Sequence, residues 1–344
     1  MSAHVRMGLV GAGRIAQSYL DVFDVLDDVT LIAVADPVED ARNNVATRMG
    51  ATAFADHESL IKNVEVDAVL VCTPPSTHTE VSRDFIEAGV AVLCEKPLAI
   101  YPERARRLIA LADSRNVLVT MASKFRYATD VAEAKRIVES GAIGETILFE
   151  NIFASRVPMH GRWNADPAVS GGGVLIDNGT HSVDIARFIL GPIVEVSAVE
   201  GKRVQGLAVE DTAEMFLRSA DGAMGTIDLS WSIDKAVDSY IGIYGSEGTI
   251  QVGWRGSRYR RANDGEWVDF GTGYDKVAAM SAQVSNFCRA VAGEEELLIT
   301  ADDAIASVDV VAAAYRSLGR NHWVAVREPI VRSIAGASRD QNVA

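Results

Sequence analysis

The sequence predicts an α/β domain with a doubly wound parallel sheet, followed by a C-terminal α+β domain built on a large, mostly antiparallel open sheet. In the first third of the chain, short apolar runs alternate with helical patterns, as they do in parallel sheets. Later segments are longer and alternate apolar with polar residues between turn signals, as antiparallel strands do. We therefore expect domains at 1–122 and 123–333 and a flexible tail at 334–344.

The composition disfavours several classes of protein. The 344 residues include 33 Lys and Arg against 47 Asp and Glu, a net charge of −14, whereas binding of nucleic-acid phosphates needs a basic surface. No apolar run approaches the length of about 20 residues that a membrane span needs, and the N-terminus lacks the layout of a signal peptide. The three cysteines are too few for a disulfide framework. We expect a cytoplasmic protein without nucleic-acid or membrane partners.

The first apolar run and the turn after it carry a dinucleotide-binding fingerprint. Residues 5–10 read as a buried strand, a glycine-rich hexapeptide follows at once, and a helical pattern continues from it. The first glycine permits a tight turn, the second lets the backbone approach a pyrophosphate, and the helix N-terminus stabilises the phosphate charge. The first domain is therefore predicted to be a Rossmann domain. Its expected cofactor contacts in this loop are Gly11, Gly13, Arg14, Ile15 and Ala16.

A carboxylate at the end of the second strand indicates which dinucleotide binds. Asp36 follows the strand 31–35 and lies 20 residues after Ala16, where a carboxylate binds the adenosine ribose hydroxyls. The next residue is Pro37, and an arginine there would be needed to hold a 2′-phosphate. NAD is therefore favoured over NADP, although Arg14 or Arg42 leaves NADP open.

Two further loops follow buried strands and are expected to face the cofactor. The strands lie at 68–72 and 90–94, and ligands of doubly wound sheets bind at the carboxyl ends of their strands. A lysine directly past a buried strand is unusual for a side chain that only meets solvent. The residues expected at the cofactor are Thr73, Pro74, His78, Glu95 and Lys96, with His78 at a helix start or on the adenosine side.

The second half of the chain has a different pattern. A helix at 128–140 is followed by strands, and two late helices, 276–292 and 301–319, either cover their sheet or return to the first domain. Turn signals such as Asp221-Gly222 separate several of the strands. We expect those strands at 145–155, 193–204, 211–219, 223–231, 237–244 and 248–254.

The segment 170–184 carries the strongest signal for chemistry. Its glycines, 171–173, let a backbone pass close to something planar or bulky. If a helix extends back to Asp177, then Asp177, His181, Asp184 and Phe188 share one face. A carboxylate four residues from a histidine orients its imidazole, which suits the transfer of a hydroxyl proton. We interpret Asp177 and His181 as catalytic and Asp184 as a structural hydrogen-bonding residue.

The simpler alternative is that Asp177 caps the helix and His181 is a packed core histidine. The glycine-rich approach and the separate evidence for a cofactor domain favour chemistry. The other histidines have no comparable setting, and no cluster of His, Cys and carboxylate has the spacing of a metal site, so we expect no metal.

Three motifs together resemble the Gfo/Idh/MocA oxidoreductases: residues 11–16, Glu95-Lys96-Pro97 and residues 171–184. The resemblance covers residues 5–330 by the order and spacing of motifs. It implies NAD(P)-dependent hydride transfer at a secondary hydroxyl or ketone of a sugar or cyclitol, as in inositol dehydrogenases, by a homodimer or homotetramer.

The same resemblance implies roles for individual residues. Lys96 would hydrogen-bond the reacting oxygen, His181 would be the acid/base, and Asp177 would position the substrate hydroxyl and support His181. Arg126 and Trp163 would lie near the nicotinamide and substrate. Asn164 is also expected at the substrate, although many relatives carry arginine at this position, which weakens inference about that side of the site.

Three other interpretations use the same residues. One is a nucleotide-sugar or keto-sugar dehydrogenase or reductase, in which the basic stretch Arg255, Arg258, Arg260 and Arg261 either holds a diphosphate or decorates an exposed hairpin. Another is an NAD-dependent glycosidase without net redox change. The third is a non-catalytic ligand sensor, which the intact set of Lys96, Asp177 and His181 disfavours.

Overall fold

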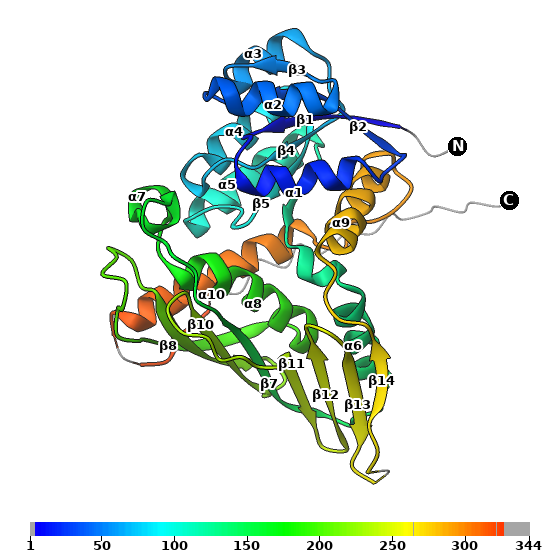
Figure 1. The fold of residues 1–344 in the computed structure, drawn as a ribbon. Helices are drawn as coiled ribbons and strands as arrows, with labels where there is room; N and C mark the ends of the chain where they lie inside the picture. The colour runs from blue at the N-terminus through cyan, green and yellow to red at the C-terminus, as the bar shows by residue number, and fades with distance from the viewer. Residues whose placement is uncertain (1–3, 264, 321, 327–344) are drawn as a thin grey trace, which may run out of the picture.

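The computed structural model describes residues 4–263, 265–320 and 322–326, and its helices and strands form two regions, each built on one sheet (Figure 1). The predicted tail at 334–344 lies outside the described residues. Among the described residues, no helix is both long and apolar enough to cross a membrane.

The first region is a doubly wound parallel sheet, which confirms the predicted Rossmann fold. Its strand order is β3-β2-β1-β4-β5-β6, so the order reverses between β1 and β4, where such sheets bind their ligands. The strands are β1 (Val5–Val10), β2 (Val29–Ala35), β3 (Thr52–Phe54), β4 (Ala68–Val71), β5 (Ala91–Glu95) and β6 (Val119–Ala122). The helices are α1 (Arg14–Phe23), α2 (Glu39–Met49), α3 (His57–Asn63), α4 (Pro75–Glu87) and α5 (Pro102–Arg115).

The second region is a nine-stranded sheet in the order β14-β13-β12-β11-β7-β10-β9-β8-β15. It is mostly antiparallel, as predicted, but β10 pairs with β7 in parallel. The strands are β7 (Thr146–Ala154), β8 (Ile193–Glu200), β9 (Thr212–Ser219), β10 (Met224–Ser230), β11 (Ser239–Gly245), β12 (Gly248–Gly253), β13 (Ser257–Arg261), β14 (Val268–Gly271) and β15 (Val324–Ala325).

Strand β8 is shorter than predicted. It ends at Glu200, whereas the sequence pattern continued to residue 204. The backbone N–H groups of Val204 and Gln205 donate to a carboxylate oxygen of Asp211, each at 2.8 Å. The Asp211 carboxylate thus replaces strand partners for these two N–H groups where the segment leaves the sheet.

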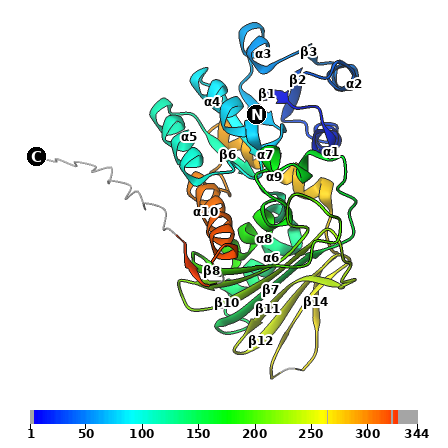
Figure 2. The same cartoon turned by 90° about the vertical axis from the view of Figure 1, so that its left-hand side faces the viewer.

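In the described part of the chain, helices cover only one face of this sheet, the face turned toward the first region (Figure 2). Residues of α8 contact β7, β9 and β10, α10 packs on β8, and α6 packs on β12 and β14. The helical elements of this half are η1 (Lys124–Tyr127), α6 (Thr129–Glu139), η2 (Trp163–Ala165), α7 (Pro167–Ser170), α8 (Val174–Leu190), α9 (Lys276–Val291) and α10 (Ala301–Leu318).

The two late helices return to the first region and join the two regions. Buried residues of α9, including Val284 and Phe287, belong to the apolar core that also contains Leu9, Tyr19 and Leu31. The first half of α10 packs in the core between β4–β6 and α4–α5, and its second half belongs to the core of the nine-stranded sheet. The two sheets therefore hold a fixed relation to each other at the carboxyl ends of β5 and β6.

Candidate active site

The glycine-rich turn between β1 and α1 has the geometry of a phosphate-binding loop. Gly11 has φ +91°, and a Cβ there would lie 2.7 Å from the backbone of Cys72, so only glycine fits. Gly13 is exposed, and a Cβ would meet nothing within 4 Å. Helix α1 has no side-chain cap, which leaves the N–H groups of its first turn for an anion. These features fit the pyrophosphate of a dinucleotide.

Asp36 lies at the end of β2, beside this turn, and supports it. One carboxylate oxygen accepts from the backbone N–H of Ala12 at 2.7 Å, and the other accepts from that of Val38 at 2.8 Å. Carboxylate oxygens have further lone pairs for ribose hydroxyls. Arg42 is turned toward the backbone, because its guanidinium donates to the carbonyl oxygens of Asp36 and Pro37.

Among the described residues, the loop after β4 has a hydroxyl without a hydrogen-bond partner and leads to a histidine whose two ring nitrogens both have partners. The buried Thr73 Oγ1 has no hydrogen-bond partner in the structure, and Pro74 is the residue before α4. The His78 ring is fully buried, and its Nδ1 and Nε2 each lie 2.7 Å from a carbonyl oxygen, of Pro97 and Thr73 respectively. The ring therefore holds two loops together, and a contact of His78 with the cofactor stays a prediction.

Glu95 is also held by the protein itself. One of its carboxylate oxygens accepts from the Tyr19 hydroxyl at 2.8 Å and the other from the backbone N–H of Lys96 at 3.1 Å. The Tyr19 hydroxyl in turn accepts from Gln283 at 3.0 Å. Burial raises the pKa of Tyr19 well above its usual range, and the Glu95 charge adds to this. This chain of contacts joins β5, α1 and α9 and fixes where the next residue, Lys96, points.

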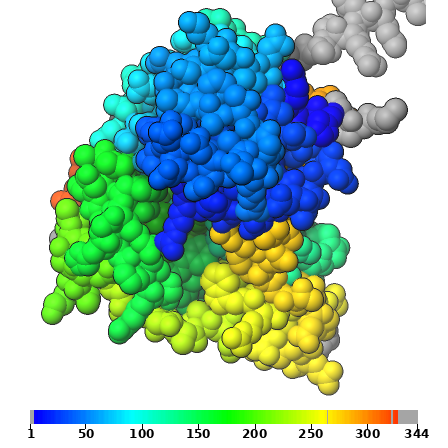
Figure 3. All heavy atoms as spheres, turned by 45° about the horizontal axis from the view of Figure 1, so that its top comes forward, coloured from blue at the N-terminus to red at the C-terminus, as the bar shows by residue number. Residues whose placement is uncertain are grey.

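Lys96 and Asp177 meet across the junction of the two regions. The Lys96 ammonium forms an ion pair with the Asp177 carboxylate and donates to the Asp177 carbonyl oxygen at 2.9 Å. Both side chains are largely buried, with 14% and 25% of their surfaces exposed. Figure 3 shows the surface hollowed where the blue first region meets the green and yellow segments of the second. The structure thus brings together two residues that are 81 positions apart in the chain.

His181 lies one turn further along α8 and is 7% exposed. Its Nδ1 is buried and has no hydrogen-bond partner, and its ring packs edge-on against Phe125 with centroids 5.2 Å apart. Burial, with the charges of Lys124 and Lys96, holds the pKa of His181 well below its usual range. The imidazole is therefore neutral at neutral pH, and no hydrogen bond joins it to Asp177 among the described residues.

The glycine triplet lets the backbone pass close to bulky groups, as predicted. A Cβ at Gly171 would lie 2.5 Å from Ile100, one at Gly172 would lie 1.9 Å from the Tyr315 hydroxyl, and one at Gly173 would lie 1.9 Å from the Glu210 carbonyl oxygen. The close approach is therefore to the protein itself. It brings the start of α8 against β9, α10 and the first region.

Glu210 was not singled out by the sequence, and it holds the N-terminus of α8. One carboxylate oxygen accepts from the N–H groups of Gly173 and Leu175 and from the Tyr315 hydroxyl, at 2.9, 3.1 and 2.7 Å. Burial raises the pKa of this carboxyl. A carboxylate at a helix N-terminus is stabilised by the helix dipole, so Glu210 fixes the helix that carries Asp177 and His181.

Arg126 lies in a buried group of ion pairs, and its expected place near the nicotinamide and substrate stays a prediction. It is 3% exposed, and its guanidinium pairs with Asp184 at 2.7 Å and Asp303 at 3.1 Å. Arg187 also faces Asp303, at 3.6 Å. Burial opposes the charge on Arg126, but the two carboxylates outweigh it and raise its pKa. Asp184 has the structural role expected of it. We call Arg126, Asp184, Arg187 and Asp303 the closed cluster.

Trp163 and Asn164 lie on η2, in the segment that crosses from β7 to α8. The Trp163 side chain is 44% exposed. The following helix, α7, packs against α4 of the first region, so this segment forms one wall of the junction. A role of these two residues in substrate binding stays a prediction.

Lys124 is a site residue that sequence reasoning passed over in favour of Arg126. It lies two residues past the end of β6, as Lys96 lies one residue past β5, and its ammonium lies 5.2 Å from the centroid of the Phe125 ring. Burial lowers the pKa of Lys124 to about 8, although the charge of Glu95 opposes this. The rule that had marked Lys96, a lysine just past a buried strand, applies equally to this residue.

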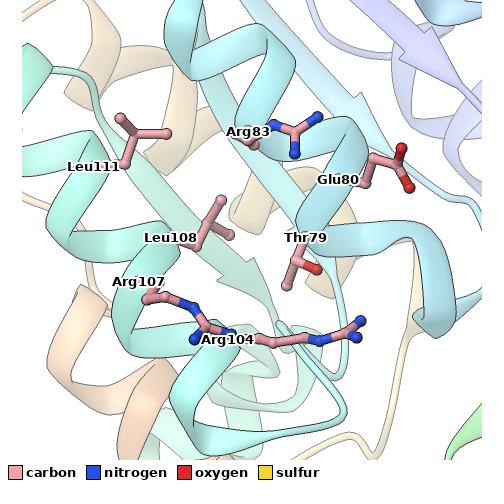
Figure 4. Close-up of a pocket in the computed structure, with 7 residues that line it drawn as sticks. All are labelled: Thr79, Glu80, Arg83, Arg104, Arg107, Leu108 and Leu111. Carbon is pink, nitrogen blue, oxygen red and sulfur yellow. The ribbon is translucent and has the colours of Figure 1, made fainter.

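A surface pocket and a cluster of arginines lie away from the junction of the two regions. A surface pocket of about 440 Å³ lies between α4 and α5, lined by Arg83, Arg104, Arg107 and other residues drawn in Figure 4, none of which was predicted to be functional. Arg258 and Arg260 of the basic stretch lie over the Trp267 ring, at 4.4 and 4.9 Å.

One group of potential metal ligands is found among the described residues. It is His57, Glu58 and Asp84, whose ligand atoms lie within 4.8 Å of one another, although their spacing in the sequence gave no sign of it. Asp84 is already shared there between His57 at 2.9 Å and Arg83 at 2.7 Å.

Comparison with known proteins supports the fold and the chemistry. A family model described as "Oxidoreductase family, NAD-binding Rossmann fold" matches residues 5–123, and the "GFO/IDH/MocA C-terminal domain" matches residues 131–251. The chain belongs to the Gfo/Idh/MocA oxidoreductase family. It is therefore an oxidoreductase that acts on CH–OH groups, and NAD is the cofactor of its Rossmann domain.

Individual relatives share the whole architecture. The chain is 30% identical to myo-inositol 2-dehydrogenase of Thermotoga maritima, over 74% of this chain and 81% of that protein. It is 27% identical to the rhizopine catabolism protein MocA of Rhizobium meliloti, over 92% and 96% of the two chains. A solved structure of levoglucosan dehydrogenase with NADH and levoglucosan has a TM-score of 0.88 at 21% identity, covering 95% of this chain and all of that one (100%).

Proposed function

We propose that this enzyme transfers hydride between NAD and a secondary hydroxyl or ketone of a sugar or cyclitol, in the manner of an inositol dehydrogenase. One observation carries the proposal: the Lys96–Asp177 ion pair lies one helical turn from a neutral, buried His181 with an unpartnered ring nitrogen. The names of the relatives, inositol and glucoside dehydrogenases among them, support the substrate class.

Each of the three residues has a defined task in this mechanism. His181 accepts the hydroxyl proton when the alcohol is oxidised, and its low pKa keeps it unprotonated beforehand. The Lys96 ammonium stabilises the negative charge that develops on the substrate oxygen. Asp177 holds Lys96 in place and accepts a hydrogen bond from the substrate. Bound NAD supplies the hydride acceptor.

The direct test is the appearance of NADH when the purified protein is mixed with NAD and a panel of inositols and simple sugars, with NADP in parallel. Oxidation of a member of the panel fixes the class, the cofactor and the substrate group together. Tight NADH binding without oxidation of any sugar or cyclitol would contradict this substrate class. Absence of NADH binding would contradict the use of the Rossmann domain for a dinucleotide.

The proposal includes a homodimer or homotetramer in the cytoplasm. The face of the nine-stranded sheet that no helix covers carries exposed apolar side chains, and such patches mark interfaces in soluble proteins. They include Val199, Phe216 and Met224, which are 37–54% exposed and alternate with the buried positions of their strands. The three cysteines are all unpaired and buried, which fits a reducing compartment. A monomer in solution scattering would overturn the oligomer.

A further inference from the structure

Lys124 carries a positive charge at the candidate site, and among the described residues no carboxylate forms an ion pair with it. The charged groups that act on it are Glu95, Lys96, Lys276 and Asp177. Lys276 is exposed, and the two carboxylates already have other partners, so none of these groups forms an ion pair with Lys124 in the described part of the chain.

The other ammonium groups are already engaged. Lys96 pairs with Asp177, and Lys276 donates to the Ser18 hydroxyl at 2.6 Å. One carboxylate oxygen of Glu95 accepts from the Tyr19 hydroxyl, and the other accepts from the backbone N–H of Lys96. In the described part of the chain, the short-range partner of the Lys124 ammonium is the ring of Phe125.

A desolvated charge without an opposite charge is costly, and a ligand of opposite charge offsets that cost. The lowered pKa of Lys124, to about 8, has burial as its main cause and agrees with this geometry. The Lys124 charge also helps to lower the pKa of His181, so an anion at Lys124 would raise the basicity of the imidazole when substrate binds.

We infer that Lys124 is a specificity-determining residue that binds a carboxylate on the substrate, so that the enzyme acts on a sugar acid or another carboxylated polyol. A single lysine matches a monoanion, whereas phosphate groups are commonly held by several donors or by an arginine fork. The inference rests on the proposed function, because it places a sugar-like substrate between Lys124 and His181.

The experiment compares carboxylated and neutral sugars on the NADH complex. Thermal-shift titrations give the Kd of D-glucuronate, D-galacturonate and D-gluconate beside D-glucose, D-galactose and D-glucitol, and kcat/KM is measured with NAD for the same six. We expect at least one acid to bind about tenfold more tightly than its neutral counterpart, the gain of one ion pair. The preference should fall to about twofold or less in Lys124→Met and persist in Lys124→Arg.

Lys276→Met is the matched control, because it removes a nearby ammonium that is exposed and engaged with Ser18. It should keep the preference. A panel in which no acid binds more tightly than its neutral counterpart would overturn the inference. So would an unchanged preference in Lys124→Met, or an equal loss of NADH affinity in that variant, which would assign Lys124 to the cofactor.

The two proposals fail in different ways. Equal kcat/KM for acids and neutral sugars would leave the sugar oxidoreductase intact and overturn the role of Lys124. Acid-dependent stabilisation that is lost in Lys124→Met, without NADH formation from any sugar, would support the carboxylate site and contradict oxidation of sugars.

Discussion

Two groups of buried charges occupy successive turns of α8, and they differ in how those charges are balanced. In the closed cluster, two arginines face two aspartates from η1, α8 and α10. At the candidate site one turn earlier, Lys96 and Asp177 pair, His181 is neutral, and Lys124 has no carboxylate partner. The charges of the closed cluster are balanced within the protein, whereas the Lys124 charge at the candidate site gains an opposite charge only when a ligand binds.

The comparison shows why a charged residue near a catalytic histidine need not be catalytic. Arg126 and Lys124 are two residues apart on η1. Arg126 forms ion pairs with Asp184 and Asp303, whereas the charges of Lys96 and Asp177 act on Lys124 electrostatically. Residues of the closed cluster should therefore control stability, and residues of the open site should control turnover.

The largest expected effect is on turnover at the open site. His181→Ala removes the proton acceptor and should lower kcat by about 10²–10⁴ while NADH affinity changes by about twofold or less. Steady-state kinetics and NADH fluorescence titration measure the two quantities. His4→Ala, which removes an exposed histidine hydrogen-bonded to Thr30, is the control and should keep full turnover. Wild-type turnover in His181→Ala would exclude His181 from the mechanism.

The next effect is on stability at the closed cluster. Asp184→Asn leaves Arg126 buried with one carboxylate fewer and should lower the free energy of unfolding by about 3 kcal/mol. Glu195→Gln breaks the exposed pair between Glu195 and Arg218 and should cost less than about 1 kcal/mol. Urea unfolding measures both. A similar cost for the two variants would mean that the buried pair contributes no more than a surface pair.

Local patterns explain what the sequence could predict. Gly11, Gly13 and Asp36 belong to one strand–turn–helix–strand unit, and Asp177 and His181 to one helix, so their spacing alone indicates their geometry. The parallel pairing of β10 with β7 was missed, because alternation along a strand is the same in either direction.

Contacts between distant segments could not be predicted in this way. Asp303 lies 177 positions after Arg126, and Glu210 reaches α8 from the loop before β9. Nothing in the local sequence of Arg126 indicates that a carboxylate from α10 will cover it. The sequence also could not identify the groups that the glycine triplet approaches, since Ile100, Tyr315 and Glu210 reach it from three separate elements.

The smallest predicted effect tests the unbalanced charge without any ligand. Burial lowers the pKa of Lys124 to about 8 in the folded protein, below its value in the unfolded chain. Below pH 8 the folded state therefore carries the cost of a half-buried ammonium, and this cost disappears as pH rises toward the unfolded pKa. Lys124→Met should be more stable than wild type by about 1–3 kcal/mol at pH 7, and the difference should shrink between pH 8 and 10.

Urea unfolding of both proteins across this range measures the difference, in which the titrations common to both chains cancel. Lys276→Met, which removes an exposed ammonium, is the control measured over the same interval. If the difference between Lys124→Met and wild type is independent of pH, then the Lys124 ammonium is solvated in the folded protein. The open site would then be as balanced as the closed cluster, and nothing in its charge would select an acid over a neutral sugar.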